Sequence, residues 1–282
     1  MQRKEKEAIA SRLRTYCVQK GSQNKAARSL VGVSSATVSQ VLSGNWDMIS
    51  DDMWRAIGGQ IGAERDAWVV AETQAYRRMV FLLENAKEDS LVLAVTGDAG
   101  CGKTEAIKTW TAGHRGVYHL CCSEYWNRRT FMVQLLRCMG VDVASGTMCD
   151  LMEDIVAVLK RTDHPLVILD EADKLSDGVL YFFISLYNQL EGRCGILLCA
   201  TGYLEVRLKR GLRCRRKGYE EIYSRIGRKF VRLQVVNGED IAAVCVANGV
   251  TDASAVNGII EDSECDLRRV RRAVWAWKKG RK

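Results

Sequence analysis

The stretch GDAGCGKTEA, residues 97–106, follows the apolar run SLVLAVT and precedes a segment of helical character. Gly97, Gly102, Lys103 and Thr104 fit the pattern G-x-x-x-x-G-K-[ST]. Glycines in such a loop let the backbone turn its N–H groups toward phosphate oxygens. The start of the following helix adds a dipole that favours an anion. We therefore expect a phosphate-binding loop between a buried strand and a helix.

Two side chains of this loop carry the expected chemistry. The Lys103 ammonium would neutralise oxygens of the β- and γ-phosphates, and the Thr104 hydroxyl would complete the coordination of a magnesium ion. The loop therefore predicts ATP and Mg²⁺ as ligands. The other positions expected to bind the nucleotide are Gly97, Asp98, Ala99, Gly100, Cys101, Gly102 and Glu105.

A second stretch, HPLVILDEADKL at residues 164–175, supplies acidic groups. The apolar residues Leu166–Leu169 are followed directly by Asp170 and Glu171. Asp170 would hold magnesium, directly or through water, and Glu171 would be the general base that polarises the attacking water. An Asp-Glu pair after a strand is otherwise a helix cap or a solvated turn, but a phosphate loop upstream favours the catalytic interpretation.

Two further positions are candidates for catalysis. Thr201 ends the run GILLCAT, where its hydroxyl could touch the γ-phosphate or the attacking water, or simply cap the next helix. Arg225, in IYSRIGRKF, suits an arginine finger offered to the nucleotide of a neighbouring subunit. Arg228 and Lys229 compete with Arg225 for that role.

Short apolar runs alternate with helical stretches between residues 90 and 235. Buried strands that alternate with helices imply a parallel sheet covered on both faces, which is an α/β fold. After Asn237 the pattern is helical to the end of the chain. The five runs expected to be strands are Ser90–Thr96, Val117–Leu120, Leu166–Leu169, Gly195–Ala200 and Val231–Val235.

Residues 1–63 read as short helices, and the segment QNKAARSLVGVSSATVSQVLSGN predicts a helix-turn-helix. Ser34 can cap its second helix and Gly44 can end it. Ala27 and Gly32 stand one residue further apart than is usual in this motif, so a plain helical hairpin remains the alternative. The residues placed to contact DNA are Lys25, Arg28, Ser35, Thr37 and Gln40.

Composition sets broader limits on the chain. It has 282 residues, 47% of them hydrophobic, with a formal net charge of +8 that favours polyanionic partners. The charged start MQRKEKEAIASRLR has no apolar core of a signal peptide, and no run is long enough to span a membrane. We therefore expect a cytoplasmic protein whose 11 cysteines are reduced thiols.

Together these motifs resemble the AAA+ ATPases, with Walker A at Gly97–Thr104, Walker B at Leu166–Glu171, sensor 1 at Thr201 and an arginine finger at Arg225. Within them the chain resembles the Mu B family of transposition proteins, which is related to TnsC- and IstB-type ATPases. That resemblance rests on the order of the helix-turn-helix, ETQAYRRM, GDAGCGKTEA, LVILDEADKL and YSRIGRK.

The resemblance implies an α/β P-loop fold with a five-stranded parallel sheet, an N-terminal all-α helix-turn-helix domain (1–63), an ATPase core (64–236) and a small C-terminal helical lid (237–282). It also implies ATP-dependent filaments on duplex DNA, delivery of that DNA to a transposase, and hydrolysis that dismantles the filament. Arg268, with Arg269 as its rival, matches sensor 2 in the lid. Arg128 and Arg129 match the family's DNA-contacting loop, or else begin a solvated helix.

Two other functions remain open at this point. One is a helicase loader of the IstB or DnaC kind, or a replication initiator. The other is a transcription regulator in which ATP gates the helix-turn-helix. The lid also looks short beside that of the Mu B family, which leaves open how a transposase would be contacted.

Overall fold

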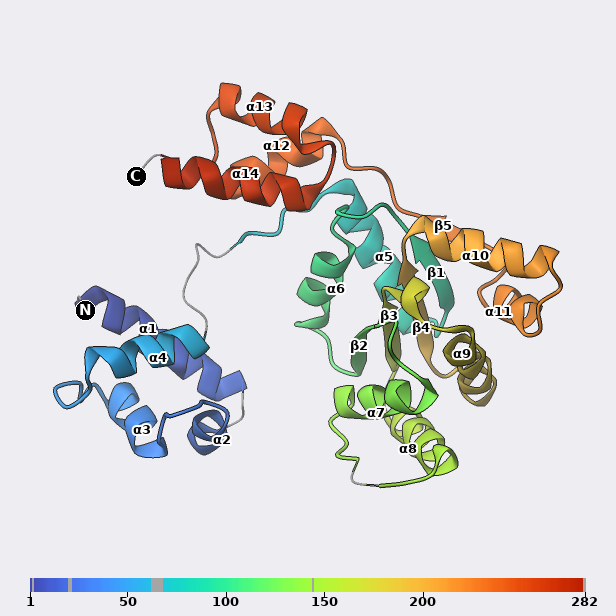
Figure 1. Ribbon diagram of the computed structural model, residues 1–282, viewed down its shortest axis with the longest axis horizontal. Coiled ribbons are helices and arrows are strands. Elements are labelled where there is room, and N and C mark those ends of the chain that lie inside the picture. The colour runs from blue at the N-terminus through green and yellow to red at the C-terminus, as the bar shows by residue number, and fades with distance from the viewer. Residues whose placement is uncertain (2, 20–21, 62–67, 144, 281–282) are drawn as a thin grey trace. The chain divides into compact units, whose positions relative to one another are not determined.

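The computed structural model describes the chain except for residues 2, 20–21, 62–67, 144 and 281–282 (Figure 1). The chain forms two compact units, Met1–Trp68 and Val69–Lys282. The expected boundary between residues 63 and 64 lies outside the described residues. The second expected boundary, at residue 237, falls inside the second unit. None of the helices in the described ranges is both long and apolar enough to cross a bilayer.

The first unit consists of helices around a small core of its own. Ser34 caps α3 by accepting a hydrogen bond from the backbone N–H of Thr37, and Gly44 ends that helix in the left-handed conformation with φ 82°. Val38 and Val41 of α3 are buried against Leu13 and other core residues. Its helices are α1 (Arg3–Gln19), α2 (Gln23–Arg28), α3 (Ser35–Ser43) and α4 (Asp51–Gln60).

The second unit is built on a five-stranded sheet in the order β2-β3-β4-β1-β5, with every pairing parallel. This confirms the predicted α/β fold. Every residue of β3 and β4 is buried, which explains why these strands read as unbroken apolar runs. The strands are β1 (Val92–Thr96), β2 (Val117–Cys121), β3 (Leu166–Asp170), β4 (Gly195–Ala200) and β5 (Phe230–Arg232).

β5 is shorter than the expected run Val231–Val235. The backbone N–H of Leu233 still donates to the Thr96 carbonyl, at 2.8 Å. After this bond the chain leaves the sheet for the C-terminal helices, so the apolar residues that follow do not continue the strand.

Helices pack around this sheet (Figure 1). α5 contacts α6 and β4, α7 contacts β2, α8 and α9, and α11 contacts α9 and α10. Residues of the sheet and of the helices α7 to α11 form a large apolar core. These elements are α5 (Gln74–Glu88), α6 (Lys103–Thr111), α7 (Arg128–Cys138), α8 (Met148–Arg161), η1 (Ala172–Lys174), α9 (Asp177–Leu190), α10 (Gly202–Arg213) and α11 (Tyr219–Arg225).

Three C-terminal helices, α12 (Gly238–Ala247), α13 (Ala253–Ser263) and α14 (Leu267–Gly280), pack on one another. Polar contacts join this helical segment to the start of the second unit. The Asn248 side chain both accepts from the backbone N–H of Val69 and donates to its carbonyl, at 3.0 and 2.9 Å. The Asp240 carboxylate accepts from the backbone N–H of Gln74 at 2.9 Å.

Candidate nucleotide-binding site

The candidate site lies at the carboxyl edge of the sheet. Because all five strands are parallel, their carboxyl ends share one edge, where ligands of open α/β sheets bind. β1 leads into the loop Gly97–Thr104, β3 ends at Asp170, and β4 leads into Thr201. These three segments therefore meet although they are far apart in the sequence.

The loop Gly97–Thr104 has a backbone suited to an anion. Gly100 and Gly102 adopt φ of 82° and 94°, a region that residues with a Cβ rarely occupy. Gly102 is the N-cap of α6 and provides no side-chain hydrogen bond to the helix. The first N–H groups of a helix have no partner within it, so this end suits phosphate oxygens.

The Lys103 ammonium folds back over the loop. Its Nζ donates to the carbonyls of Gly97 and Asp98, at 2.7 and 2.8 Å. The cation is thus held inside the concave backbone where the loop would receive phosphate. Its role in neutralising phosphate charge stays a prediction.

Thr104 and Asp170 are in direct contact, although 66 positions separate them. The Thr104 hydroxyl donates to Asp170 Oδ2 at 2.7 Å, and only 1% of Asp170 is exposed. A hydroxyl and a carboxylate are the oxygen ligands that magnesium prefers. The pair therefore fits the predicted magnesium site.

His119, on β2, is a member of this site that the sequence did not indicate. Its Nε2 lies 3.5 Å from Asp170 Oδ2. Burial raises the pKa of Asp170, but contacts with His119 and Thr104 outweigh it, so the pKa stays below its usual value. Asp170 is therefore ionised at neutral pH, as a magnesium ligand must be. The strand register, which sets His119 opposite Ile168, brings the imidazole here.

Glu171 follows Asp170 with a left-handed backbone, at φ 56°. Such a conformation is uncommon for a residue with a side chain and is concentrated at functional sites. Its Oε2 accepts a hydrogen bond from Lys174 Nζ at 2.6 Å and lies 3.6 Å from Cys121 Sγ. The predicted general base is thus at the sheet edge, where Lys174 holds it.

Thr201 makes two polar contacts. Its hydroxyl donates to Asp173 Oδ2 at 2.7 Å and accepts from the backbone N–H of Tyr203 at 3.3 Å. It therefore caps α10 and also joins the end of β4 to the segment after β3. The expected helix cap is therefore present, and the contact of Thr201 with the γ-phosphate or the attacking water stays a prediction.

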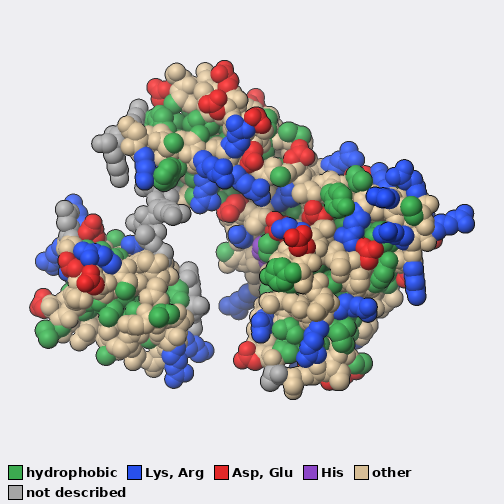
Figure 2. Space-filling model, in the orientation of Figure 1, with side chains coloured by type: hydrophobic (Ala, Val, Ile, Leu, Met, Phe, Trp, Pro, Cys, Tyr) green, Lys and Arg blue, Asp and Glu red, His purple; other side chains and the backbone are tan. Residues whose placement is uncertain are grey.

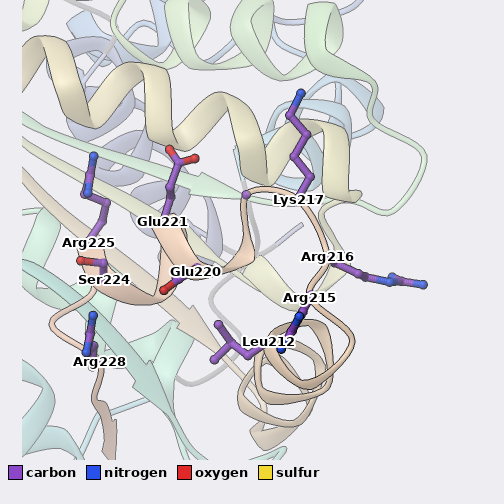
Figure 3. Close-up of a pocket in the computed structure, with 10 residues that line it drawn as sticks. Leu212, Arg215, Arg216, Lys217, Glu220, Glu221, Ser224, Arg225 and Arg228 are labelled. Carbon is purple, nitrogen blue, oxygen red and sulfur yellow. The ribbon is translucent and has the colours of Figure 1, made fainter.

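The predicted arginines lie in two places. Arg225, at the end of α11, donates to Asn188 Oδ1 and stacks over Tyr187, with its guanidinium carbon 5.2 Å from the ring centre. It lines a cavity with Arg228 that includes none of the phosphate-loop residues (Figure 3). At the start of α14, Arg268 is exposed, whereas Arg269 pairs with Glu264 at 2.6 Å.

The C-terminal segment closes directly onto the phosphate loop. The backbone N–H of Leu267 donates to the Gly100 carbonyl at 3.0 Å. The Asp266 carboxylate lies so close that a Cβ added to Gly100 would be 2.1 Å from Oδ1. Asp266 precedes the expected sensor arginine, but its contact with Gly100 has no signal in the sequence.

Gly100→Ala is expected to displace the start of α14 from the phosphate loop. The new Cβ meets Asp266, and a left-handed residue other than glycine costs about 1–2 kcal/mol. We expect a lower free energy of unfolding and faster hydrogen exchange at the Leu267 N–H. Gly140→Ala is the matched control, because Gly140 has φ 79° and open space around it. Equal effects of the two variants would contradict the proposed contact.

The residues predicted to contact DNA lie in both units. In the first unit Lys25, Arg28 and Ser35 are exposed, while Thr37 and Gln40 are half-buried. In the second unit Arg128 and Arg129 are exposed at the start of α7, and Arg129 donates to the Gly146 carbonyl at 2.6 Å. All seven positions therefore retain some access to solvent.

Part of the chain matches a known family model. Residues 86–208 match the family model described as "AAA domain", a segment that contains β1–β4 and both acidic and phosphate-loop motifs. No curated protein matches the chain. A solved chain from "Structure of Drosophila ORC bound to DNA" is 16% identical, with a TM-score of 0.47, over 74% of this chain and 56% of that chain. This chain thus spans little more than half of that solved chain.

Proposed function

We propose that this chain, whose residues 86–208 form an AAA domain, is an ATP-dependent DNA-binding protein of DNA transposition. It would form filaments on duplex target DNA and deliver that DNA to a transposase. The contact of Thr104 with the buried Asp170, beside an uncapped helix start, carries the ATPase part of this proposal. The resemblance in motif order to the Mu B family supports the transposition part.

The residues of the site have separate tasks in hydrolysis. Lys103 and the backbone N–H groups at the start of α6 would bind and orient the phosphates of ATP. Thr104 and Asp170 would hold magnesium, which neutralises charge on the phosphate oxygens when bound. Glu171 would accept a proton from the attacking water, and the Thr201 hydroxyl would position that water or the γ-phosphate.

Assembly would place the nucleotide between two copies of the chain. Arg225 faces a cavity separate from the phosphate loop, so it is suited to a nucleotide held by a second copy. Arg268 would contact the nucleotide of its own subunit from the lid. Bound ATP would then join neighbours into a homo-oligomer, and its cleavage would release them.

A helicase loader or an ATP-gated transcription regulator would use the same ATPase site. The capped α3, which follows α2 after a turn containing Gly32, favours the regulator as the second candidate. A regulator would bind one operator as a dimer. A filament ATPase would cover long stretches of duplex with little preference for sequence.

Electron microscopy of the full chain with duplex DNA, magnesium and a slowly hydrolysed ATP analogue tests the proposal. We expect continuous coating of duplexes of unrelated sequence, and no coating without nucleotide. Deletion of residues 1–63 should leave the coating in place if the ATPase unit carries the DNA contact. Protein that stays monomeric on DNA under these conditions would overturn the proposal.

A further inference from the structure

The positive charge of the chain is concentrated in one segment. Residues 207–232 contain eleven Lys and Arg side chains against two Glu, a formal charge of +9, whereas the whole chain has +8. The rest of the chain is therefore close to neutral. Figure 2 shows basic side chains gathered on the part of the second unit formed by α10 and α11. The proposed ATPase chemistry uses only Arg225 from this segment.

Within this segment lies a cavity of about 740 Å³. Figure 3 shows Arg225 and Arg228 at one end of α11, and Arg215, Arg216 and Lys217 on the loop before its other end. Two acidic residues of the lining, Glu220 and Glu221, lie in the first turn of α11, where the helix dipole favours them. Five cations on one cavity form a surface suited to phosphate oxygens.

Three basic residues of the segment are already neutralised, but most of those that line the cavity are not. Arg207 pairs with Asp177, and Lys209 and Arg232 both pair with Glu205. Arg215, Lys217 and Arg228 have no ion-pair partner among the described residues, and Arg216 reaches Asp177 only at 3.5 Å. These four cations are exposed and available to an external anion.

The loop that carries Arg215, Arg216 and Lys217 is held in place by the protein interior. Gly211 and Gly218 lie against Tyr219 and Tyr181, where an added Cβ would come within 2.0 and 2.6 Å of ring atoms. The Tyr219 hydroxyl donates to Asp177 Oδ1 at 2.8 Å. The loop is therefore pre-organised, which lowers the entropy lost when it binds a ligand.

Two of these four exposed cations have unusual backbones. Arg215 and Arg228 adopt φ of 49° and 56°, in the left-handed region. Their backbone conformations are stabilised locally, since the N–H of Arg216 donates to Gly211 and that of Arg228 to Tyr223. Left-handed residues with side chains cluster at functional sites, and here two of them line one cavity.

We propose that the loop of residues 215–217 at this cavity, together with the exposed face of α10, binds the phosphodiester backbone of duplex nucleic acid. The inference rests on the proposed DNA-binding function and adds a surface outside the positions assigned above. Exposed Arg210 and Arg213 continue the charge beyond the cavity along α10. Duplex DNA is a polymer with one charge every ~1.7 Å along its axis. A charged surface of this extent suits such a polymer better than it suits the single triphosphate bound to a second copy of the chain.

The test compares a triple variant with the wild type on fluorescent duplex DNA of random sequence. With magnesium and a slowly hydrolysed ATP analogue, Arg215→Ala, Arg216→Ala and Lys217→Ala together should weaken binding about tenfold or more. The slope of log affinity against log salt should become shallower by up to about three. Binding of a fluorescent ATP analogue should not change. Alanine also has a Cβ, so the strain at Arg215 is unaltered.

Two further variants control for charge and for folding. Arg137→Ala, Lys160→Ala and Arg161→Ala remove three exposed cations from α7 and α8, and should leave both affinity and salt slope near wild type. Arg215→Lys with Arg216→Lys keeps the charge and should retain most of the affinity. Thermal unfolding of each variant verifies that it is folded.

Wild-type chain that binds no duplex with nucleotide present would overturn the proposed function and this inference together. Wild-type binding that the triple variant retains in full would overturn this inference alone, and would favour Arg128 and Arg129 as the contact. The triple variant could instead keep DNA binding but lose the ATP hydrolysis that self-assembly stimulates. That result would mean that the cavity contacts a second copy of the chain, and it also overturns the inference.

Discussion

Lys103→Ala is expected to weaken ATP binding at least about 100-fold and, with it, to abolish coating of duplex DNA. The ammonium lies inside the phosphate loop, where it contacts the carbonyls of Gly97 and Asp98. A methyl group in its place leaves the phosphate charge uncompensated. Titration with a fluorescent ATP analogue in the presence of magnesium measures the loss, and electron microscopy measures the coating.

Lys108→Ala is the matched control for that experiment. Lys108 is exposed on the same helix, α6, about one turn beyond Lys103. Its removal changes the net charge equally but leaves the phosphate loop intact, so ATP affinity and coating should stay near wild type. Equal ATP affinity of the two variants would mean that the loop Gly97–Thr104 is not the nucleotide site.

Glu171→Gln is expected to lower the rate of ATP hydrolysis about 10²- to 10⁴-fold while ATP binding persists. Glutamine has the shape of glutamate but cannot take a proton from water. Because assembly would need bound ATP and disassembly its cleavage, coating of duplex DNA should become long-lived. Phosphate release gives the rate, and the lifetime of the coated DNA gives the second readout.

Folding should survive this change. The ion pair of Glu171 with Lys174 is partly exposed, with side-chain exposures of 36% and 46%, so its loss costs at most about 1 kcal/mol. Glu153→Gln, an exposed substitution on α8, is the control and should hydrolyse ATP as the wild type does. If Glu171→Gln lost DNA binding instead, the proposed cycle of assembly and release would be wrong.

Local patterns predicted the elements of the fold closely. The expected Ser34 cap and Gly44 end of α3 are both present. The apolar run of β4 has the expected bounds as well. Each of these features depends on residues within a few positions of one another, so hydrophobic periodicity and capping residues are enough to find it.

The sequence predicted the site residues that belong to a motif, and it missed those that belong to none. The contact of Thr104 with Asp170 follows from two motifs. The phosphate loop comes directly after one strand, the acidic motif ends another, and both strands belong to one parallel sheet. His119 belongs to no motif. Only the register of β2 against β3 sets it beside Asp170. The pairing of Thr201 with Asp173 likewise depends on β4 lying next to β3.

From the order of its residues alone, this chain specifies a phosphate loop, an acidic strand end, the buried strands β3 and β4, and a capped helix after a turn. Each of these features depends on hydrogen bonds and side-chain spacing within a short stretch of the chain. The closure of Asp266 onto Gly100, the histidine beside the magnesium ligand and the basic cavity of α10 and α11 arise only in the folded molecule. They join residues far apart in the chain, and packing of helices against a sheet of defined register decides which of those residues meet.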